Sequence, residues 1–251
     1  MSTKIEWVQN PDGTKGKTWN PITGCTKISP GCQHCYAERM AMRLAGRHGY
    51  PLKDPFSVTL HPDRIEQPLR WKKPLTIFVC SMSDYFHEDV PKSFIFNIIE
   101  VIEKCPQHIF QILTKRANRM LEISEEIGYW PDNVWVGATV ESKEYEERIE
   151  FLRKINASIK FLSFEPLLSN LGDLNLDGIS WVIVGGESGP GSRSMQSEWA
   201  INIRDQCLEK NIPYFFKQWG GTNKKVNGRK LEGIEWNQMP SLNSLSYSYN
   251  F

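Results

Sequence analysis

The sequence lacks a surplus of either charge, because its 30 Lys and Arg residues nearly match its 29 Asp and Glu residues. With a formal net charge of +1, the chain has no overall field that would recruit nucleic acid. It also lacks an apolar run long enough to cross a membrane, and residues 1–9 lack the apolar core of a signal peptide. These absences predict a cytoplasmic protein without a membrane partner.

Cysteine is scarce, with six residues in a chain of 251. The cytoplasm keeps thiols reduced, so we expect metal ligands, catalytic thiols or buried apolar residues rather than disulfides. Three cysteines are clustered within eleven residues and are the candidate metal ligands: Cys25, Cys32 and Cys35. The other three are scattered at apolar positions and are expected in the core: Cys80, Cys105 and Cys207.

Short apolar runs alternate with helical patterns from Thr76 onward, as in a parallel sheet built from right-handed crossover units. The length suits one domain. The sequence predicts an α/β fold, a TIM-barrel-like partial parallel (β/α) barrel of about six strands plus a seventh. The expected strands cover residues 19–23, 77–80, 109–113, 134–137, 159–162, 181–184 and 214–216. The expected helices cover residues 37–45, 91–104, 141–155 and 197–211, the last one capped by Ser197.

The domain boundaries follow from changes in composition. Residues 1–221 are expected to form the partial barrel, with a charged and proline-rich insertion near 46–73 that lies outside it. Residues 222–251 read as a polar C-terminal extension of the same domain, containing a small hairpin that turns at Asn227-Gly228.

The cysteine loop is the strongest chemical signal in the sequence. Thiolates are the ligands that iron–sulfur clusters and zinc prefer, and glycine and proline let a short loop direct its sulfurs inward. A structural zinc site would need a fourth ligand such as His34 or His48, whereas a four-iron cluster with three cysteines leaves one iron open. A loop that follows the first strand would lie at the carboxyl rim of the barrel, where such folds place their active sites.

The phrase from Thr18 to Cys25 and from Ser29 to Met40 resembles the signature of a phage-associated, uncharacterised family related to spore photoproduct lyase, within the radical S-adenosylmethionine (SAM) superfamily. The resemblance continues through residues 161–167, 182–189 and 216–221. The common radical SAM loop has three residues between its first two cysteines, and this one has six.

The resemblance implies an enzyme that holds a 4Fe-4S cluster on Cys25, Cys32 and Cys35 and binds SAM at the open iron. Reductive cleavage of SAM would then give a 5'-deoxyadenosyl radical for nucleotide or nucleic-acid modification or repair. A reducing partner such as flavodoxin or ferredoxin is expected. Whether the enzyme is a lyase or a transferase is left open.

Polar residues that follow the strands are the candidate SAM-binding residues, because they would face one cavity. Radical SAM enzymes commonly bind the SAM amino group after the second strand, where Asp84 offers the charge beside Ser81 and Ser83. Lys115 or Arg116 would pair with the SAM carboxylate or a substrate phosphate. For each residue the alternative is an ordinary charge or cap at a helix start.

Later strands add further candidates. Thr139 and Glu141 would accept hydrogen bonds from ribose hydroxyls, and Glu165 follows the fifth strand. A glycine-rich turn begins with Gly185, Gly186 and Glu187, where backbone can approach a cofactor closely, although it lacks the spacing of a dinucleotide fingerprint or a P-loop.

Two other classes of function remain open from the sequence. One is a non-catalytic phage accessory protein, stabilised by zinc or a cluster, that binds nucleic acid through Trp219 and the basic residues of the extension. The other is a redox protein that exchanges thiols, although no thioredoxin-like strand arrangement surrounds Cys32 and Cys35.

Overall fold

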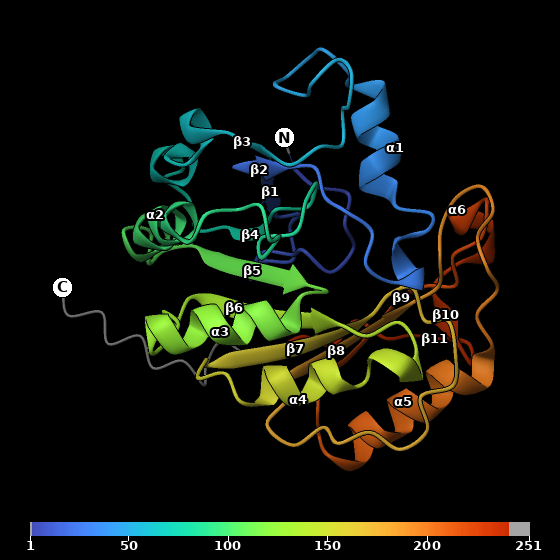
Figure 1. Ribbon diagram of the computed structural model, residues 1–251. Helices are drawn as coiled ribbons and strands as arrows, with labels where there is room; N and C mark the ends of the chain where they lie inside the picture. Colours follow the sequence, from blue (N-terminus) through green and yellow to red (C-terminus); the bar gives the residue numbers. More distant parts are fainter. Residues whose placement is uncertain (1, 241–251) are drawn as a thin grey trace.

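The computed structural model describes residues 2–240 and shows a curled sheet of seven parallel strands in the order β1-β4-β5-β6-β7-β8-β9 (Figure 1). The prediction of a partial parallel barrel with a seventh strand is confirmed. The strands are β1 (Lys17–Trp19), β4 (Thr76–Val79), β5 (Ile109–Thr114), β6 (Val134–Thr139), β7 (Ile159–Phe164), β8 (Trp181–Gly185) and β9 (Tyr214–Gln218). Each strand pairs in parallel with the next in this order, so all the carboxyl ends meet at one edge.

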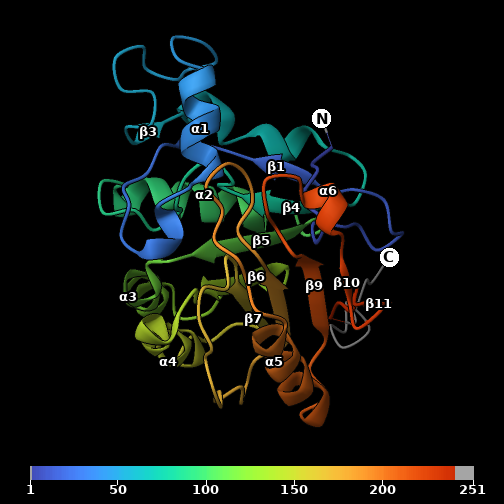
Figure 2. The same cartoon turned by 90° about the vertical axis from the view of Figure 1, so that its right-hand side faces the viewer.

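Helices follow most strands and cover the outer face of the sheet (Figures 1 and 2). They are α2 (Lys92–Glu103), α3 (Ala117–Ile127), α4 (Glu147–Arg153) and α5 (Ser197–Glu209). Helix α1 (Tyr36–Arg43) belongs instead to a separate apolar cluster with Tyr50 and Phe56. Helix α3 was not among the predicted helices. The predicted cap of α5 is wrong, because Gln196 precedes the helix and the Ser197 hydroxyl donates to Glu198 at 3.0 Å.

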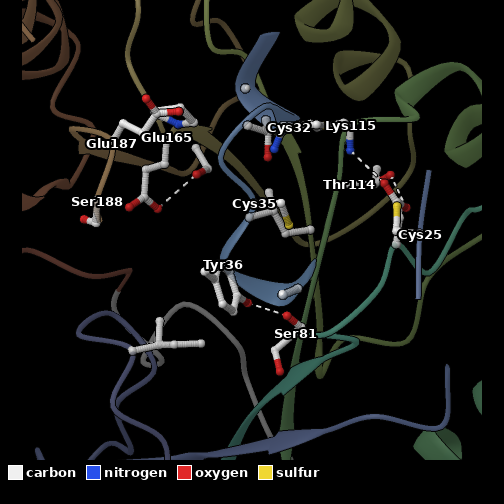
Figure 3. Close-up of a pocket in the computed structure, with 18 of the residues that line it drawn as sticks. Cys25, Cys32, Cys35, Tyr36, Ser81, Thr114, Lys115, Glu165, Glu187 and Ser188 are labelled. Atoms are coloured by element: carbon white, nitrogen blue, oxygen red, sulfur yellow. Dashed lines mark hydrogen bonds between the residues drawn. The ribbon is translucent and has the colours of Figure 1, made fainter. Parts of the chain in front are cut away.

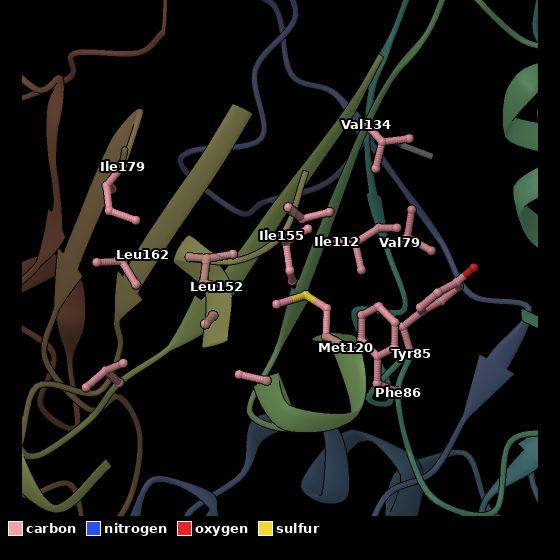
Figure 4. Close-up of a cluster of buried hydrophobic side chains, with 14 of the residues drawn as sticks. Val79, Tyr85, Phe86, Ile112, Met120, Val134, Leu152, Ile155, Leu162 and Ile179 are labelled. Atoms are coloured by element: carbon pink, nitrogen blue, oxygen red, sulfur yellow. The ribbon is translucent and has the colours of Figure 1, made fainter. Parts of the chain in front are cut away.

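The outer core lies between the sheet and these helices. Period-two alternation sends residues such as Ile112 and Leu162 outward, where Met120 of α3 and Leu152 of α4 pack on them (Figure 4). Most of these side chains are fully buried. Continuous apolar strands of this kind are typical of a parallel sheet that is covered on both faces.

The inner core fills the concave face and is built from aromatic rings. The N-terminal segment supplies Trp7, whose ring lies 4.8 Å from that of Phe78 and 6.1 Å from that of Trp181. Phe161 and Trp135 complete this cluster around the Trp181 ring. The half-barrel is therefore plugged by its own N-terminal residues, which the sequence reading did not anticipate, and only its rim remains open to polar chemistry.

The first predicted strand is corrected by the structure. The stretch expected to run from residue 19 to 23 breaks at Asn20-Pro21 into β1 and a separate strand, β2 (Ile22–Thr23). Strand β2 leaves the main sheet and pairs antiparallel with β3 (Thr59–Leu60). Proline has no N–H to give to a sheet ladder, so the break falls where the chain could not continue pairing.

The predicted hairpin at Asn227-Gly228 is also corrected. Asn227 ends a short helix, α6 (Lys224–Asn227), and the hairpin lies downstream between β10 (Lys230–Leu231) and β11 (Ile234–Glu235). Its two loop residues, Glu232 and Gly233, both have positive φ values of 51° and 78°, as a tight two-residue hairpin loop requires. The prediction that residues 241–251 belong to the extension lies outside the described residues.

Residues 46–73 contribute β3, which lies outside the main sheet, and two 3-10 turns, Pro62–Arg64 and Gln67–Arg70. They also pack against the cysteine loop and α1, through Tyr50 and Phe56. No helix among residues 2–240 is long and apolar enough to cross a membrane.

We expect Gly137→Ala to destabilise the protein, because a Cβ at this position would lie 2.5 Å from the tip of the Phe161 ring. Overpacking of a filled core costs about 1–3 kcal/mol of unfolding free energy. In a Phe161→Leu background the shorter side chain relieves the contact, so the same glycine substitution should cost less. Denaturant unfolding of the four proteins measures this coupling, and equal costs in both backgrounds would contradict it.

Candidate active site

One pocket lies at the carboxyl edge of the strands, with a volume of about 280 Å³. Its wall holds all three clustered cysteines and most of the predicted rim residues, which are Ser81, Ser83, Asp84, Lys115, Thr139, Glu165, Gly186 and Glu187. Glu141 and Gly185 lie just behind that wall. In Figure 3, Cys25 lies on one side of the pocket and Glu165 and Glu187 on the other, with Cys32 and Cys35 between them.

The cysteine loop is held by contacts from three directions. The backbone N–H of Cys25 donates to the Phe56 carbonyl at 3.0 Å. Its neighbour Gly24 has a φ of 83°, and a Cβ there would lie 2.0 Å from the Ser57 carbonyl, so the close approach requires glycine. Cys32 ends a 3-10 turn, and Cys35 directly precedes α1. Cys25 lies two residues after the end of β2.

The three thiols are free and partly exposed. A single zinc ion would need sulfurs about 3.8 Å apart. Among residues 2–240, no three His, Cys, Asp or Glu side chains are arranged to hold one metal ion. A four-iron cluster binds each thiolate at a separate iron and accepts a wider spacing, so the donor set of three thiols on one wall suits it chemically.

Burial raises the pKa of the Cys25 thiol to about 11, with the nearby Asp84 carboxylate adding to the effect. A cysteine that binds a metal does so as a thiolate, so a metal bound at Cys25 would have to displace this proton. The three scattered cysteines lie in the core, as predicted, and Cys105 and Cys207 are fully buried. Cys80 also touches the pocket wall, although it is only 3% exposed.

Asp84 is an internal anchor as the structure stands. One carboxylate oxygen accepts from the Thr114 hydroxyl at 2.6 Å and from the Phe86 N–H at 3.0 Å. The other accepts from the Lys115 N–H at 3.2 Å and from the Arg116 guanidinium at 3.3 Å. Both carboxylate oxygens of Asp84 thus accept hydrogen bonds that join the segment after β4 to the end of β5.

The two serines that follow β4 are also bonded to the protein. The Ser83 hydroxyl donates to the Ile22 carbonyl at 2.9 Å, and the Ser81 hydroxyl donates to Asn20 Oδ1 at 3.1 Å. The Ser81 carbonyl accepts from the Tyr36 hydroxyl, a contact drawn in Figure 3. Tyr36 thereby links α1 to the strand ends. Sequence reasoning missed it, because its partner lies 45 residues away.

Lys115 is the cation of the pocket wall that is left for a ligand. Of the three lysine and arginine residues on that wall, Arg116 and Lys217 are ion-paired. Lys115 has no ion pair within residues 2–240. An uncompensated ammonium on a pocket wall favours an anionic group in the bound molecule.

Glu165 and Lys217 form an ion pair of 2.9 Å on the wall of the pocket. Glu165 follows β7 and Lys217 lies in β9, and β8, which ends at Gly185, lies between these two strands. A Cβ at Gly185 would lie 2.9 Å from a Glu165 carboxylate oxygen, so this glycine makes room for the pair. The Ser163 hydroxyl donates to the second oxygen of Glu165 at 3.1 Å. Burial alone would lower the pKa of Lys217, but Glu165 and Glu6 together raise it.

The glycine-rich turn after β8 clamps the cysteine loop. The Glu187 carboxylate accepts from the Arg193 N–H and Nε, both at 2.9 Å, and Arg193 Nη2 donates to the Pro30 carbonyl at 2.9 Å. Burial would raise the pKa of Glu187, but the hydrogen bonds from Arg193 outweigh it and lower the pKa. Gly186 approaches the Trp219 carbonyl so closely that a Cβ would lie 2.0 Å from it.

Glu141 is fully buried behind the pocket. One oxygen pairs with Arg148 at 2.7 Å, while the other has no hydrogen-bond partner among residues 2–240 and faces Gly31 of the cysteine loop. Thr139 stays on the pocket wall, and its carbonyl accepts from the same arginine at 2.9 Å. The two residues proposed to bind ribose are therefore adjacent, but only Thr139 reaches the pocket.

The residues expected to bind nucleic acid in the alternative reading make internal contacts. The Trp219 ring packs at 4.9 Å from that of Phe216, and its N–H donates to the Lys230 carbonyl at 2.9 Å. Arg229 lies over the Phe215 ring and bonds Asn237.

Comparison with known proteins gives a family. A family model described as a protein of unknown function, DUF5131, matches residues 2–240. No curated protein matches the sequence. Solved structures similar to this chain include spore photoproduct lyase complexed with dinucleoside spore photoproduct, at 12% identity and a TM-score of 0.46, covering 83% of this chain and 63% of that one.

A mutant of the same lyase with bound AdoMet and dinucleoside spore photoproduct matches at 10% identity and a TM-score of 0.43, covering 83% of this chain and 65% of that one. The chain thus spans under two thirds of the length of these lyases.

We expect Glu165 and Lys217 to be energetically coupled, because both are largely shielded from solvent and each alone would leave a charge without its partner. Glu165→Gln and Lys217→Met should each destabilise the protein, and the double variant should cost about 1–2 kcal/mol less than the two single costs combined. Denaturant unfolding provides the values. The exposed pair Glu100 and Lys104 is the control, with coupling near zero; additive costs at the pocket would refute the coupling.

Proposed function

We propose that this chain, which belongs to the DUF5131 family of proteins of unknown function, is a radical SAM enzyme that binds a 4Fe-4S cluster through Cys25, Cys32 and Cys35. The observation that carries the proposal is the presence of three free thiols on the wall of one pocket at the carboxyl edge of a parallel half-barrel. Parallel β/α folds build their active sites at this edge.

The bound cluster would pass one electron to the sulfonium of SAM, so that a carbon–sulfur bond breaks and gives methionine and a 5'-deoxyadenosyl radical that takes a hydrogen atom from the substrate. The electron would come from a reducing partner such as flavodoxin or ferredoxin. The chain itself has to bind SAM, orient it and keep water away from the radical.

Lys115 is the residue that would bind the carboxylate of SAM, because its ammonium lacks an ion-pair partner within residues 2–240 and lines the same pocket as the cysteines. Thr139 lies on the same wall, and its hydroxyl would accept a hydrogen bond from a ribose hydroxyl or donate one to it. Gly186 lines the same pocket, so its backbone would lie beside the adenosyl portion.

The apolar floor of the pocket would protect the radical. Ile5 and Trp7 of the N-terminal plug, with Phe78 and Leu113 of the strands, line the pocket below its polar rim. Closely packed apolar side chains exclude water and offer no proton donors, which limits side reactions. The ion pair of Glu165 and Lys217 would then contact the substrate at the opposite end from Cys25.

The substrate class that we propose is a nucleotide or nucleic acid. The support is the sequence resemblance of the cysteine phrase and of residues 161–167, 182–189 and 216–221 to a family related to spore photoproduct lyase. A phage origin is proposed on the same ground, and a cytoplasmic location because all six cysteines are free thiols.

Anaerobic reconstitution with iron and sulfide, followed by reduction in the presence of SAM, should yield methionine and 5'-deoxyadenosine in equal amounts. Replacing Cys25, Cys32 or Cys35 by alanine should abolish both products, because each change removes a thiolate ligand. Cys207→Ala is the matched control, since this cysteine is buried in α5 away from the pocket, and it should keep its activity. Product formation that survives loss of all three clustered cysteines would refute the assignment.

Lys115→Met should weaken SAM binding by the reconstituted protein about tenfold or more, because a charge-assisted hydrogen bond is worth about 1.5–3 kcal/mol. Isothermal titration with SAM gives the Kd. Lys104→Met, an exposed lysine at the end of α2, should leave the Kd unchanged. An unchanged Kd in the Lys115 variant would mean that another group binds the carboxylate.

A further inference from the structure

Arg116 touches one of the candidate cluster ligands and has no role in the function described so far. Its side chain is only 3% exposed, although it carries a permanent charge. Nη1 donates to the Cys25 sulfur at 3.5 Å, which makes it the charged group in direct contact with that thiol. A buried guanidinium is expensive unless it is fully paired, so its partners need to be accounted for.

All three nitrogens of the guanidinium are in use. Nε donates to both carboxylate oxygens of Glu88, at 2.9 and 2.8 Å. Nη1 donates to Asp84 at 3.3 Å as well as to Cys25, and Nη2 donates to the Thr26 hydroxyl at 2.9 Å. The guanidinium therefore joins Thr26, the residue after Cys25, to the loop that follows β4. These hydrogen bonds fix the direction of Nη1 toward the sulfur.

The backbone of Arg116 is fixed too. Its N–H donates to the Thr114 hydroxyl at 2.8 Å, and that hydroxyl donates in turn to Asp84. Arg116 directly precedes α3, so the end of β5 and the start of the helix hold it on both sides. His87 packs at the same spot against Thr26, and burial, with Arg116 adding to it, lowers its pKa. The positive charge beside Cys25 is thus that of Arg116.

We propose that Arg116 sets the reduction potential of the cluster through its hydrogen bond to the Cys25 sulfur, as a positioning residue rather than a catalytic one. The inference rests on the proposed function, since it requires a cluster at Cys25. Hydrogen bonds to the ligand sulfurs and nearby charge are among the main determinants of cluster potential. A fixed positive charge favours the form that carries one more electron, so Arg116 raises the potential.

The carboxylates of Asp84 and Glu88 each offset part of the positive charge of Arg116, but to different extents. Asp84 is 9% exposed on its side chain and is held by the ends of β4 and β5, so its charge is a constant part of the site. Glu88 is 62% exposed and touches the guanidinium from the solvent side. Its charge is partly screened by water and can be removed without opening the core, which makes it the right residue for an opposite test.

The experiment is a redox titration of the reconstituted protein, followed by electron paramagnetic resonance, together with iron and sulfide analysis. Arg116→Gln should shift the midpoint potential downward, because an uncharged amide stabilises the reduced cluster less. Arg116→Lys should restore part of the shift, since it retains the charge. Glu88→Gln should shift the midpoint upward by a smaller amount, because it removes a partly screened negative charge from the same group.

Arg119→Gln is the matched control. Arg119 lies on the next part of α3 and donates to the Phe86 and Val90 carbonyls of the same loop, without contact to a sulfur. The Arg119→Gln variant should have the same midpoint potential as the unchanged protein. The control thus separates loss of loop support from loss of charge at Cys25.

The outcomes are distinct. Variants of Arg116 and Glu88 that retain full iron and sulfide but show the unchanged midpoint would overturn the proposal. A loss of iron in Arg116→Gln without any shift in Glu88→Gln would also overturn it, leaving Arg116 with a structural role only. If Arg116→Gln does not fold, the upward shift of the exposed Glu88→Gln variant decides. Failure of the unchanged protein to bind a cluster would instead refute the proposed function.

Discussion

The parallel direction of all seven strands is the constraint on which the site depends. Because every strand ends at the same edge, residues far apart in the sequence reach one pocket without any further adjustment of the chain. The concave face behind that edge is filled by aromatic rings, with Trp7 from the N-terminal segment at their centre. Polar groups are consequently confined to the rim, where the cysteine loop lies across them.

Charge balance at this rim is nearly complete before any ligand binds. Glu165 pairs with Lys217, Glu187 with Arg193, and Asp84 with Arg116, each within 3.3 Å. Fixed pairs of this kind keep side chains in one orientation, so a bound molecule meets groups that need little reorganisation. The exception on the pocket wall is Lys115, and this asymmetry is the electrostatic reason to expect an anionic group beside the cysteines.

The sequence was sufficient to predict the sheet and the rim but not the contacts among rim residues. Continuous apolar runs locate the strands, and the residues after them must face a common edge, so Glu165 and Glu187 were found in this way. Their partners could not be found, because the pairing of Glu165 with Lys217 depends on how far the sheet curls and on the absence of a side chain at Gly185. The break at Pro21 and the position of the hairpin at Gly233 likewise depend on local backbone chemistry that apolar periodicity does not register.

The six residues between Cys25 and Cys32 have a structural use that the spacing alone did not reveal. They include the first two residues of the 3-10 turn Pro30–Cys32, and the Pro30 carbonyl accepts the bond from Arg193 that ties this loop to the turn after β8. A Cβ at Gly31 would lie 3.1 Å from the oxygen of Glu141 that has no partner in the described part of the chain, so a larger residue would crowd it. A loop with only three residues between these cysteines would be too short to make these contacts and also return to the position of Cys35. The longer spacing therefore lets the segments that follow β5 and β8 hold the cysteine loop, at Cys25 through Arg116 and at Pro30 through Arg193.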